Sequence, residues 1–74
     1  MNWIYTKDRT PITYKEGHWD GKNSDQVLAE DINGKRYLAH YCEGFMDGYN
    51  FKEWYDDKDW EITTEIIRYI KIPD

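Results

Sequence analysis

Four side chains in the sequence have the chemistry of metal ligands or nucleophiles: His18, Asp20, His40 and Cys42. His40 and Cys42 are two positions apart, so on a β-strand both side chains leave the same face, and a tetrahedral zinc ion would accept such a set. The spacing is unspecific, however, and no second Cys-x-x-Cys pair supports it. A buried Cys42 beside a partly exposed His40 is the favoured interpretation. The sequence therefore predicts no metal and no cofactor.

A nucleophilic Cys42 would need His18 within reach as its base, together with an orienting acid and an oxyanion hole. The sequence shows no sign of these partners. The adjacent acids Asp56 and Asp57 could act as acid and base or hold magnesium, but such acids on a surface segment are usually solvated. Residues 17–22 lack the length and the Ser or Thr of a phosphate-binding loop. We therefore expect the protein not to be an enzyme.

The net charge of −5 comes from one segment, residues 43–61, which holds seven acids and two lysines and is also rich in aromatic residues. An acidic field repels nucleic-acid phosphate and anionic lipid, so direct binding of nucleic acid or membranes is not expected, whereas a basic surface on a partner protein is complementary. The alternative is a solvated acidic face whose rings turn into the core. The candidate partner-binding residues are Glu43, Asp47, Tyr49, Glu53, Tyr55, Asp56, Asp57, Asp59 and Trp60.

A second hypothesis belongs to another class: a homo-oligomer that binds a small ligand such as a nucleotide. The four Trp and seven Tyr could build a stacking pocket for a base, although a chain of 74 residues needs most of its rings for the core. The cations that could meet the phosphates are Arg9, Lys22, Arg36 and Arg68.

The elements that position these residues are mainly strands. The dipeptide Asn33-Gly34 separates two β-prone segments, residues 26–32 and 35–42, and supplies the positive φ angles of a two-residue type I′ turn. Neither face of this hairpin is purely polar, so both are expected to be partly covered, which is compatible with self-association. The predicted register pairs Ile32 with Lys35, Asp31 with Arg36 and Ala29 with Leu38.

Three further elements are expected. Residues 62–72 are rich in β-branched residues and predict a strand, with a helix as the alternative because Ile62, Ile66 and Ile70 are spaced by four. Residues 3–5 predict a short first strand. Residues 50–60 predict a short helix, with Asn50 as N-cap and Glu53 three positions later. Residues 7–24 read mainly as a loop. The expected fold is a small α+β domain over residues 1–74, mainly β, with an antiparallel sheet of three to four strands, a central Asn-Gly hairpin and one short helix near 50–60.

Length and composition limit the class of protein. The single cysteine excludes an internal disulfide. The sequence contains no run of about 20 apolar residues, which a membrane-spanning helix would need. The N-terminus does not read as a signal peptide. A soluble, cytoplasmic protein is therefore expected.

Residues spread over most of the chain resemble a known pattern: Trp3-Ile4, Arg9-x-Pro11, Val27-Leu28 with a following turn that ends in Gly34, Ala39-x-Tyr41, Trp54, and Ile66 followed by Tyr69-x-x-Ile72-Pro73. The pattern resembles the family named domain of unknown function 551, which occurs in phage and prophage proteins and usually has Trp at the position of Tyr69. The family has no established catalytic residues that could be transferred.

The resemblance implies a phage or prophage protein that acts in the cytoplasm of a bacterial host. Together with the acidic segment it leads to the main hypothesis, a non-catalytic accessory protein that binds a host protein, such as a defence factor, and inhibits or modulates it through an acidic aromatic surface. The alternative is the homo-oligomer that sequesters a nucleotide signalling molecule.

Overall fold

Every element of the computed structural model, which describes residues 2–16 and 21–72, is a β-strand. All strand pairings are antiparallel, and all eight strands belong to one sheet. The strands are β1 (Ile4–Tyr5), β2 (Thr13–Glu16), β3 (Lys22–Ser24), β4 (Val27–Asp31), β5 (Arg36–Met46), β6 (Tyr49–Asp56), β7 (Glu61–Ile62) and β8 (Ile66–Lys71). The mainly β, antiparallel prediction is confirmed, with more strands than the three to four expected.

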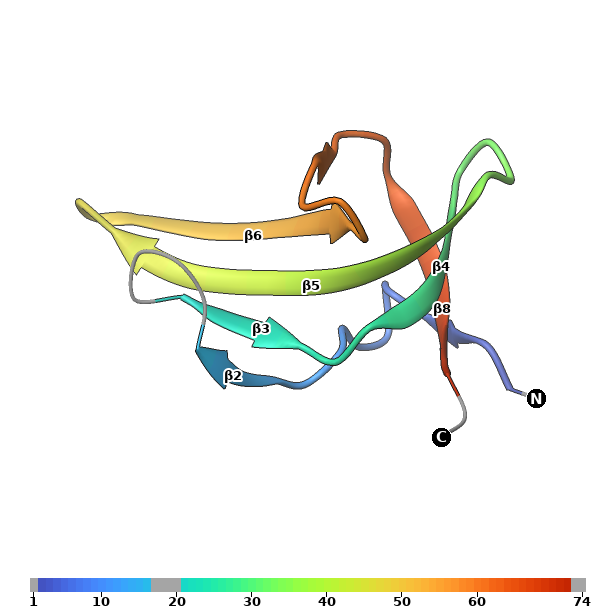
Figure 1. Cartoon of the computed structure of the whole chain (residues 1–74), viewed down its shortest axis with the longest axis horizontal. Coiled ribbons are helices and arrows are strands. Elements are labelled where there is room, and N and C mark those ends of the chain that lie inside the picture. Colours follow the sequence, from blue (N-terminus) through green and yellow to red (C-terminus); the bar gives the residue numbers. More distant parts are fainter. Residues whose placement is uncertain (1, 17–20, 73–74) are drawn as a thin grey trace.

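The central strand is β5, which is long enough to serve two neighbours on one edge. Its first half pairs with β4 and its second half with β3, while β6 pairs with its opposite edge from Ala39 to Met46. The sheet continues from β4 to β8 and β1, and from β3 to β2. Figure 1 shows the result, a curved sheet in which the hairpin of β5 and β6 reaches past the ends of β2 and β3.

The connection between β4 and β5 differs from the predicted two-residue Asn-Gly hairpin, which is wrong. Glu30, not Asp31, pairs with Arg36, so the register is shifted by one residue. The N–H of Gly34 donates to the carbonyl of Asp31 at 3.0 Å, and Gly34 alone has a positive φ of 85°. This is a type I turn followed by a left-handed residue, which makes a three-residue loop. The shift moves every side chain of β5 to the opposite face relative to the prediction.

The predicted helix over residues 50–60 is also wrong, because β6 occupies residues 49–56. Asp47 and Gly48, with φ angles of 52° and 78°, form a two-residue turn that places Tyr49 opposite Met46. Asp-Gly is one of the dipeptides that favour type I′ turns. The hairpin signal expected at Asn33-Gly34 is thus realised here.

The two ends of the chain follow the prediction in outline. The short first strand is β1, and residues 62–72 contain the last residue of β7 and all of β8 rather than one strand. Residues 7–24, expected to be mainly a loop, contain the short strands β2 and β3, while residues 7–12 are not in a strand. No helix long and apolar enough to cross a membrane occurs in the described part of the chain.

One face of the sheet, here called the core face, carries the apolar core. Ala29 and Ala39 have no exposed surface, and small side chains there let larger neighbours approach. The Trp54 ring contacts Tyr41 and Tyr69, with ring centroids 5.1 and 5.9 Å apart. Aromatic rings thus supply much of the core, because the chain has few buried aliphatic residues. The core cluster consists of Val27, Ala29, Ala39, Ile66 and Tyr69.

The opposite face, here called the outer face, carries a charged cluster on neighbouring strands. The carboxylate of Glu30 binds Arg36 and Arg68, each at 2.9 Å, and both guanidinium groups lie against the ring of Trp3. The hydrogen bond from Arg36, opposed by burial and assisted by Arg68, lowers the pKa of the Glu30 carboxyl. The cluster ties β4, β5 and β8 together across the sheet and holds Trp3, the residue before β1.

We expect the protein to lose stability in acid because of this cluster. A carboxylate whose pKa is lower in the folded state stabilises the fold above its unfolded pKa of about 4.3, and this stabilisation is lost as the pH falls through the folded pKa. The urea midpoint should therefore be lower at pH 3 than at pH 6. Glu30→Gln should show a smaller difference between the two pH values, and equal dependence in both proteins would contradict this role of Glu30.

Candidate functional site

The turn between β6 and β7 repeats the geometry of the turn between β4 and β5. The Oδ1 atom of Asp56 accepts hydrogen bonds from the N–H groups of Lys58 at 2.9 Å and Trp60 at 3.0 Å. Asp31 Oδ1 does the same for two N–H groups at the same offsets, both at 2.9 Å. Asp59 takes the left-handed position with a φ of 62°. Asp56 therefore stabilises the turn in which Asp57, Asp59 and Trp60 are exposed to solvent.

The other end of β6 is the tip of the β5–β6 hairpin. Phe45 is 57% exposed and Tyr49 is 65% exposed on either side of the turn, which is unusual for rings of this size in a small domain. Asp47 occupies the turn itself. The tip therefore offers aromatic surface and a negative charge.

Alternate residues of β6 form a strip on the outer face, here called the β6 strip, made of Tyr49, Phe51, Glu53 and Tyr55. The Tyr55 ring stacks on His40, with centroids 5.7 Å apart. The Tyr55 hydroxyl donates to the Glu53 carboxylate, and this hydrogen bond, more than burial, raises the pKa of the Tyr55 hydroxyl. The strip is thus aromatic surface around a carboxylate.

The sheet divides the nine predicted partner-binding residues among several places. Tyr49, Glu53 and Tyr55 lie together on the β6 strip. Glu43 lies on the core face, where it accepts a 2.6 Å hydrogen bond from Thr13. The turn and the tip are about 23 Å apart along β6 at about 3.3 Å per residue. The turn presents Asp57, Asp59 and Trp60, which is 71% exposed, while Asp47 lies at the tip and Asp56 is engaged in the turn.

The edge of β6 is open over most of its length. Within the described residues, β6 pairs with β5 along the whole strand but with β7 only at Trp54 and Tyr55. A two-residue turn is flanked by a hydrogen-bonded pair, and such pairs alternate along antiparallel strands. The alternation directs the N–H groups of Asn50 and Lys52 toward the open side. An extended peptide could therefore pair with this edge.

The residues considered for metal binding or nucleophilic attack do not form a site in the part of the chain that the structure describes. No group of three or more His, Cys, Asp or Glu side chains there could hold a metal ion. Cys42 is buried, and burial together with the charges of Glu53 and Glu43 raises the pKa of its thiol, whereas an activated nucleophile needs a lowered one. His18 and Asp20 lie outside the described residues.

The four cations considered for phosphate binding are not gathered in one place. Arg36 and Arg68 share the Glu30 carboxylate on the outer face. Lys22 lies on β3, and Arg9 lines a pocket on the core face. Among the cation–π contacts of the described residues, the only ring that Arg36 or Arg68 contacts is that of Trp3.

Sequence reasoning missed two members of the β6 strip and its surroundings, Phe51 and His40. The signal that could have found them is Asp47-Gly48 between two segments rich in aromatic residues, which predicts a hairpin. Once that hairpin is assumed, pairing across a two-residue turn places His40 opposite Tyr55 and Gly44 opposite Phe51, as the structure has them.

Comparison of the chain with models of known protein families, with curated proteins and with solved structures finds no match.

Proposed function

We propose that this is a non-catalytic binding protein that takes up an extended, basic segment of a partner protein along the open edge of β6. The observation that carries the proposal is the open edge itself, next to the exposed ring of Tyr49 and the carboxylate of Glu53. Pairing with a sheet edge gives affinity through main-chain hydrogen bonds, while side chains on alternate positions give selectivity.

The charge of the surroundings selects the partner. Residues 43–61 hold seven acids and two lysines, so the edge and both ends of β6 lie in a negative field. This field favours a lysine- or arginine-rich segment and speeds its approach. It disfavours nucleic acid, and it also disfavours edge-to-edge pairing of two copies, because like charges would face each other.

The resemblance to the phage and prophage family supports the biological setting of the proposal. We propose that the partner is a protein of the bacterial host, such as a defence factor, which the chain inhibits or modulates in the host cytoplasm. A small protein that occupies a basic surface blocks whatever else that surface binds.

A peptide of alternating lysine and valine residues tests the edge. It should shift the amide resonances of residues 49–53 in a ¹⁵N-labelled sample, whereas a peptide of alternating glutamate and valine should not. Asn50→Pro removes an N–H that points to the open side, so it should weaken lysine-peptide binding roughly tenfold without breaking a β5–β6 hydrogen bond. Tyr49→Ser should also weaken binding, because it removes the exposed ring.

Two outcomes would contradict the proposal. Equal binding of both peptides would remove the role of charge, and full affinity in both variants would remove the role of the edge. Asp57→Lys serves as a matched control for long-range charge, since it leaves the β6 edge intact. For the host partner, a protein captured from a bacterial lysate by the wild-type chain should be lost with Asn50→Pro.

A further inference from the structure

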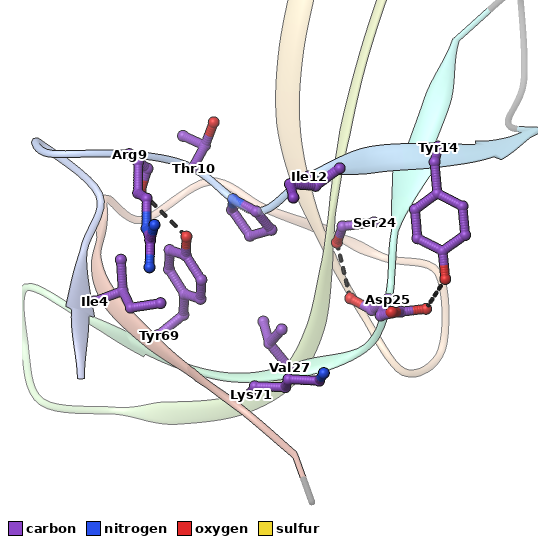
Figure 2. A pocket seen from close by; sticks show the side chains of 11 residues that line it. Ile4, Arg9, Thr10, Ile12, Tyr14, Ser24, Asp25, Val27, Tyr69 and Lys71 are labelled. Atoms are coloured by element: carbon purple, nitrogen blue, oxygen red, sulfur yellow. Dashed lines mark hydrogen bonds between the residues drawn. The ribbon is translucent and has the colours of Figure 1, made fainter. Parts of the chain in front are cut away.

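A pocket of about 330 Å³ lies on the core face, between the sheet and the segment that connects β1 to β2. Its volume is at the lower end of the range for small-molecule sites. Residues from β1, β4 and β8 line it on the sheet side, and residues 9–12 cover it (Figure 2). These strands lie at the opposite end of the sheet from the hairpin tip (Figure 1), so the pocket is separate from the β6 edge.

The floor of the pocket is apolar and its shape is fixed. Ile4, Val27 and the ring of Tyr69 come from three neighbouring strands, and Val27 and Tyr69 belong to the core cluster. The Tyr69 hydroxyl donates to the main-chain carbonyl of Arg9 at 3.3 Å, and Pro11 is buried. The covering segment is thus tied to the sheet, and a ligand would enter a hollow that already exists.

The rim of the pocket leaves apolar surface exposed. Ile12 is 82% exposed although it lines the pocket. An isoleucine that is largely exposed beside a hollow contributes little to the core, whereas an apolar ligand body lying in the pocket would cover part of its side chain.

Two cations of the pocket have no partner among the ion pairs of the described residues: Arg9, from the covering segment, and Lys71, from β8. The acid of the pocket, Asp25, is engaged by Lys15 at 2.8 Å and by the hydroxyl of Tyr14 at 2.5 Å. The pocket lining thus holds two cations, Arg9 and Lys71, and one carboxylate that is already bound from outside the pocket by Lys15. The pocket therefore combines an apolar floor with an excess of positive charge, in a protein whose net charge is −5.

We propose that this pocket binds a small organic anion, with its apolar or aromatic body on Val27 and Tyr69 and its carboxylate or phosphate between Arg9 and Lys71. A guanidinium and an ammonium on two separate elements bind such groups by charge-assisted hydrogen bonds. This binding is independent of the β6 edge, and it gives the protein a ligand that can modulate the stability of its core.

The test uses phenylacetate, phenyl phosphate, phenylacetamide and inorganic phosphate with ¹⁵N-labelled protein. Both organic anions should shift amide resonances of residues 9, 10, 27 and 69–71, and the neutral amide should bind roughly tenfold more weakly because it lacks the charge. The tighter of the two organic anions identifies the head group as carboxylate or phosphate. Inorganic phosphate should bind more weakly than phenyl phosphate, because it gains nothing from the apolar floor.

Matched variants separate the pocket from general electrostatics. Arg9→Gln and Lys71→Gln should each weaken the organic anions roughly fivefold to tenfold, while Lys58→Gln, which removes the same charge in the β6–β7 turn, should not. Arg9→Gln keeps the main-chain carbonyl that accepts from the Tyr69 hydroxyl, so the covering segment stays bound to the sheet. Equal binding of the amide and the anions, or equal loss in all three variants, would overturn the proposal. Asn50→Pro should leave anion binding unchanged, so the two proposals can fail separately.

Discussion

Replacing Asp31 by alanine is expected to lower the melting temperature by roughly 10 °C or more. The Asp31 side chain is buried, and its carboxylate accepts hydrogen bonds from the N–H groups of Asn33 and Lys35 and from the Tyr37 hydroxyl, each at 2.9 Å. Burial alone would raise the pKa of this carboxyl, but these hydrogen bonds outweigh burial and lower it. Alanine would leave the donors without their acceptor next to the core.

Two variants show whether the lower melting temperature of Asp31→Ala comes from the buried position of the carboxylate or only from its hydrogen bonds in the turn. Asp56→Ala removes two equivalent main-chain hydrogen bonds in the solvent-exposed β6–β7 turn, so its effect in the same thermal melt should be clearly smaller. Asp31→Asn keeps one oxygen for the two N–H groups and should lie between wild type and Asp31→Ala. Equal losses for Asp31→Ala and Asp56→Ala would show that the buried position adds nothing.

The same aspartate favours the observed register of the β4–β5 hairpin, which the dipeptide Asn33-Gly34 alone does not determine. Both a two-residue and a three-residue loop accept this dipeptide, and they differ by one residue in register. Asp at the first position of a type I turn binds the N–H two residues later, which favours the longer loop. The longer loop also pairs Glu30 with Arg36 and puts Ala39 rather than Leu38 on the core face. Which face of β5 is buried depends on contacts outside the hairpin.

The error over residues 50–60 has a different cause. Asn50 and Glu53 fit a helix N-terminus locally, and Phe51, Trp54 and Tyr55 fit one helical side. In the structure, Asp47-Gly48 folds the segment back onto β5, where every residue from 49 to 56 finds a partner. A helix of two or three turns is marginal by itself, so an available strand partner decides.

The candidate site was predictable in composition but not in arrangement. The acidic excess of residues 43–61 follows from counting, yet only the pairing shows that Glu43 and Asp56 are used within the sheet while Glu53 lies on the β6 strip. The pocket was even harder to predict from the sequence. Arg9 and Lys71 are far apart in sequence, and they line the same pocket because β1, which precedes Arg9, pairs with β8, which carries Lys71. No local pattern could indicate that arrangement.

Gly44→Ala is expected to destabilise the protein by about 2 kcal/mol, against the usual direction for glycine in a strand. Alanine in a strand interior normally gains roughly 0.5–1 kcal/mol over glycine. At Gly44, however, the added Cβ would lie 2.5 Å from Cζ of Phe51 and 2.6 Å from the Cα of Gly21, both closer than real Cβ contacts. The Phe51 ring can move, but the main chain at Gly21 leads directly into β3 and cannot shift alone. The steric clash should therefore outweigh the usual gain in stability from alanine in a strand.

A double-mutant cycle with Phe51→Leu separates the two contacts, measured as free energies of unfolding in urea. Shortening Phe51 should recover only part of the loss from Gly44→Ala, because the contact with Gly21 remains. Full recovery would show that the ring alone opposes the methyl group, and a stabilised Gly44→Ala protein would show that β3 can move without cost.

The methyl group added at Gly44 would also press on the ring of Phe51, which belongs to the β6 strip. Gly44→Ala should therefore shift the amide resonances of residues 49–53 as well as those of β3. Shifts confined to β3 would show that the change at Gly44 does not reach the open edge of β6.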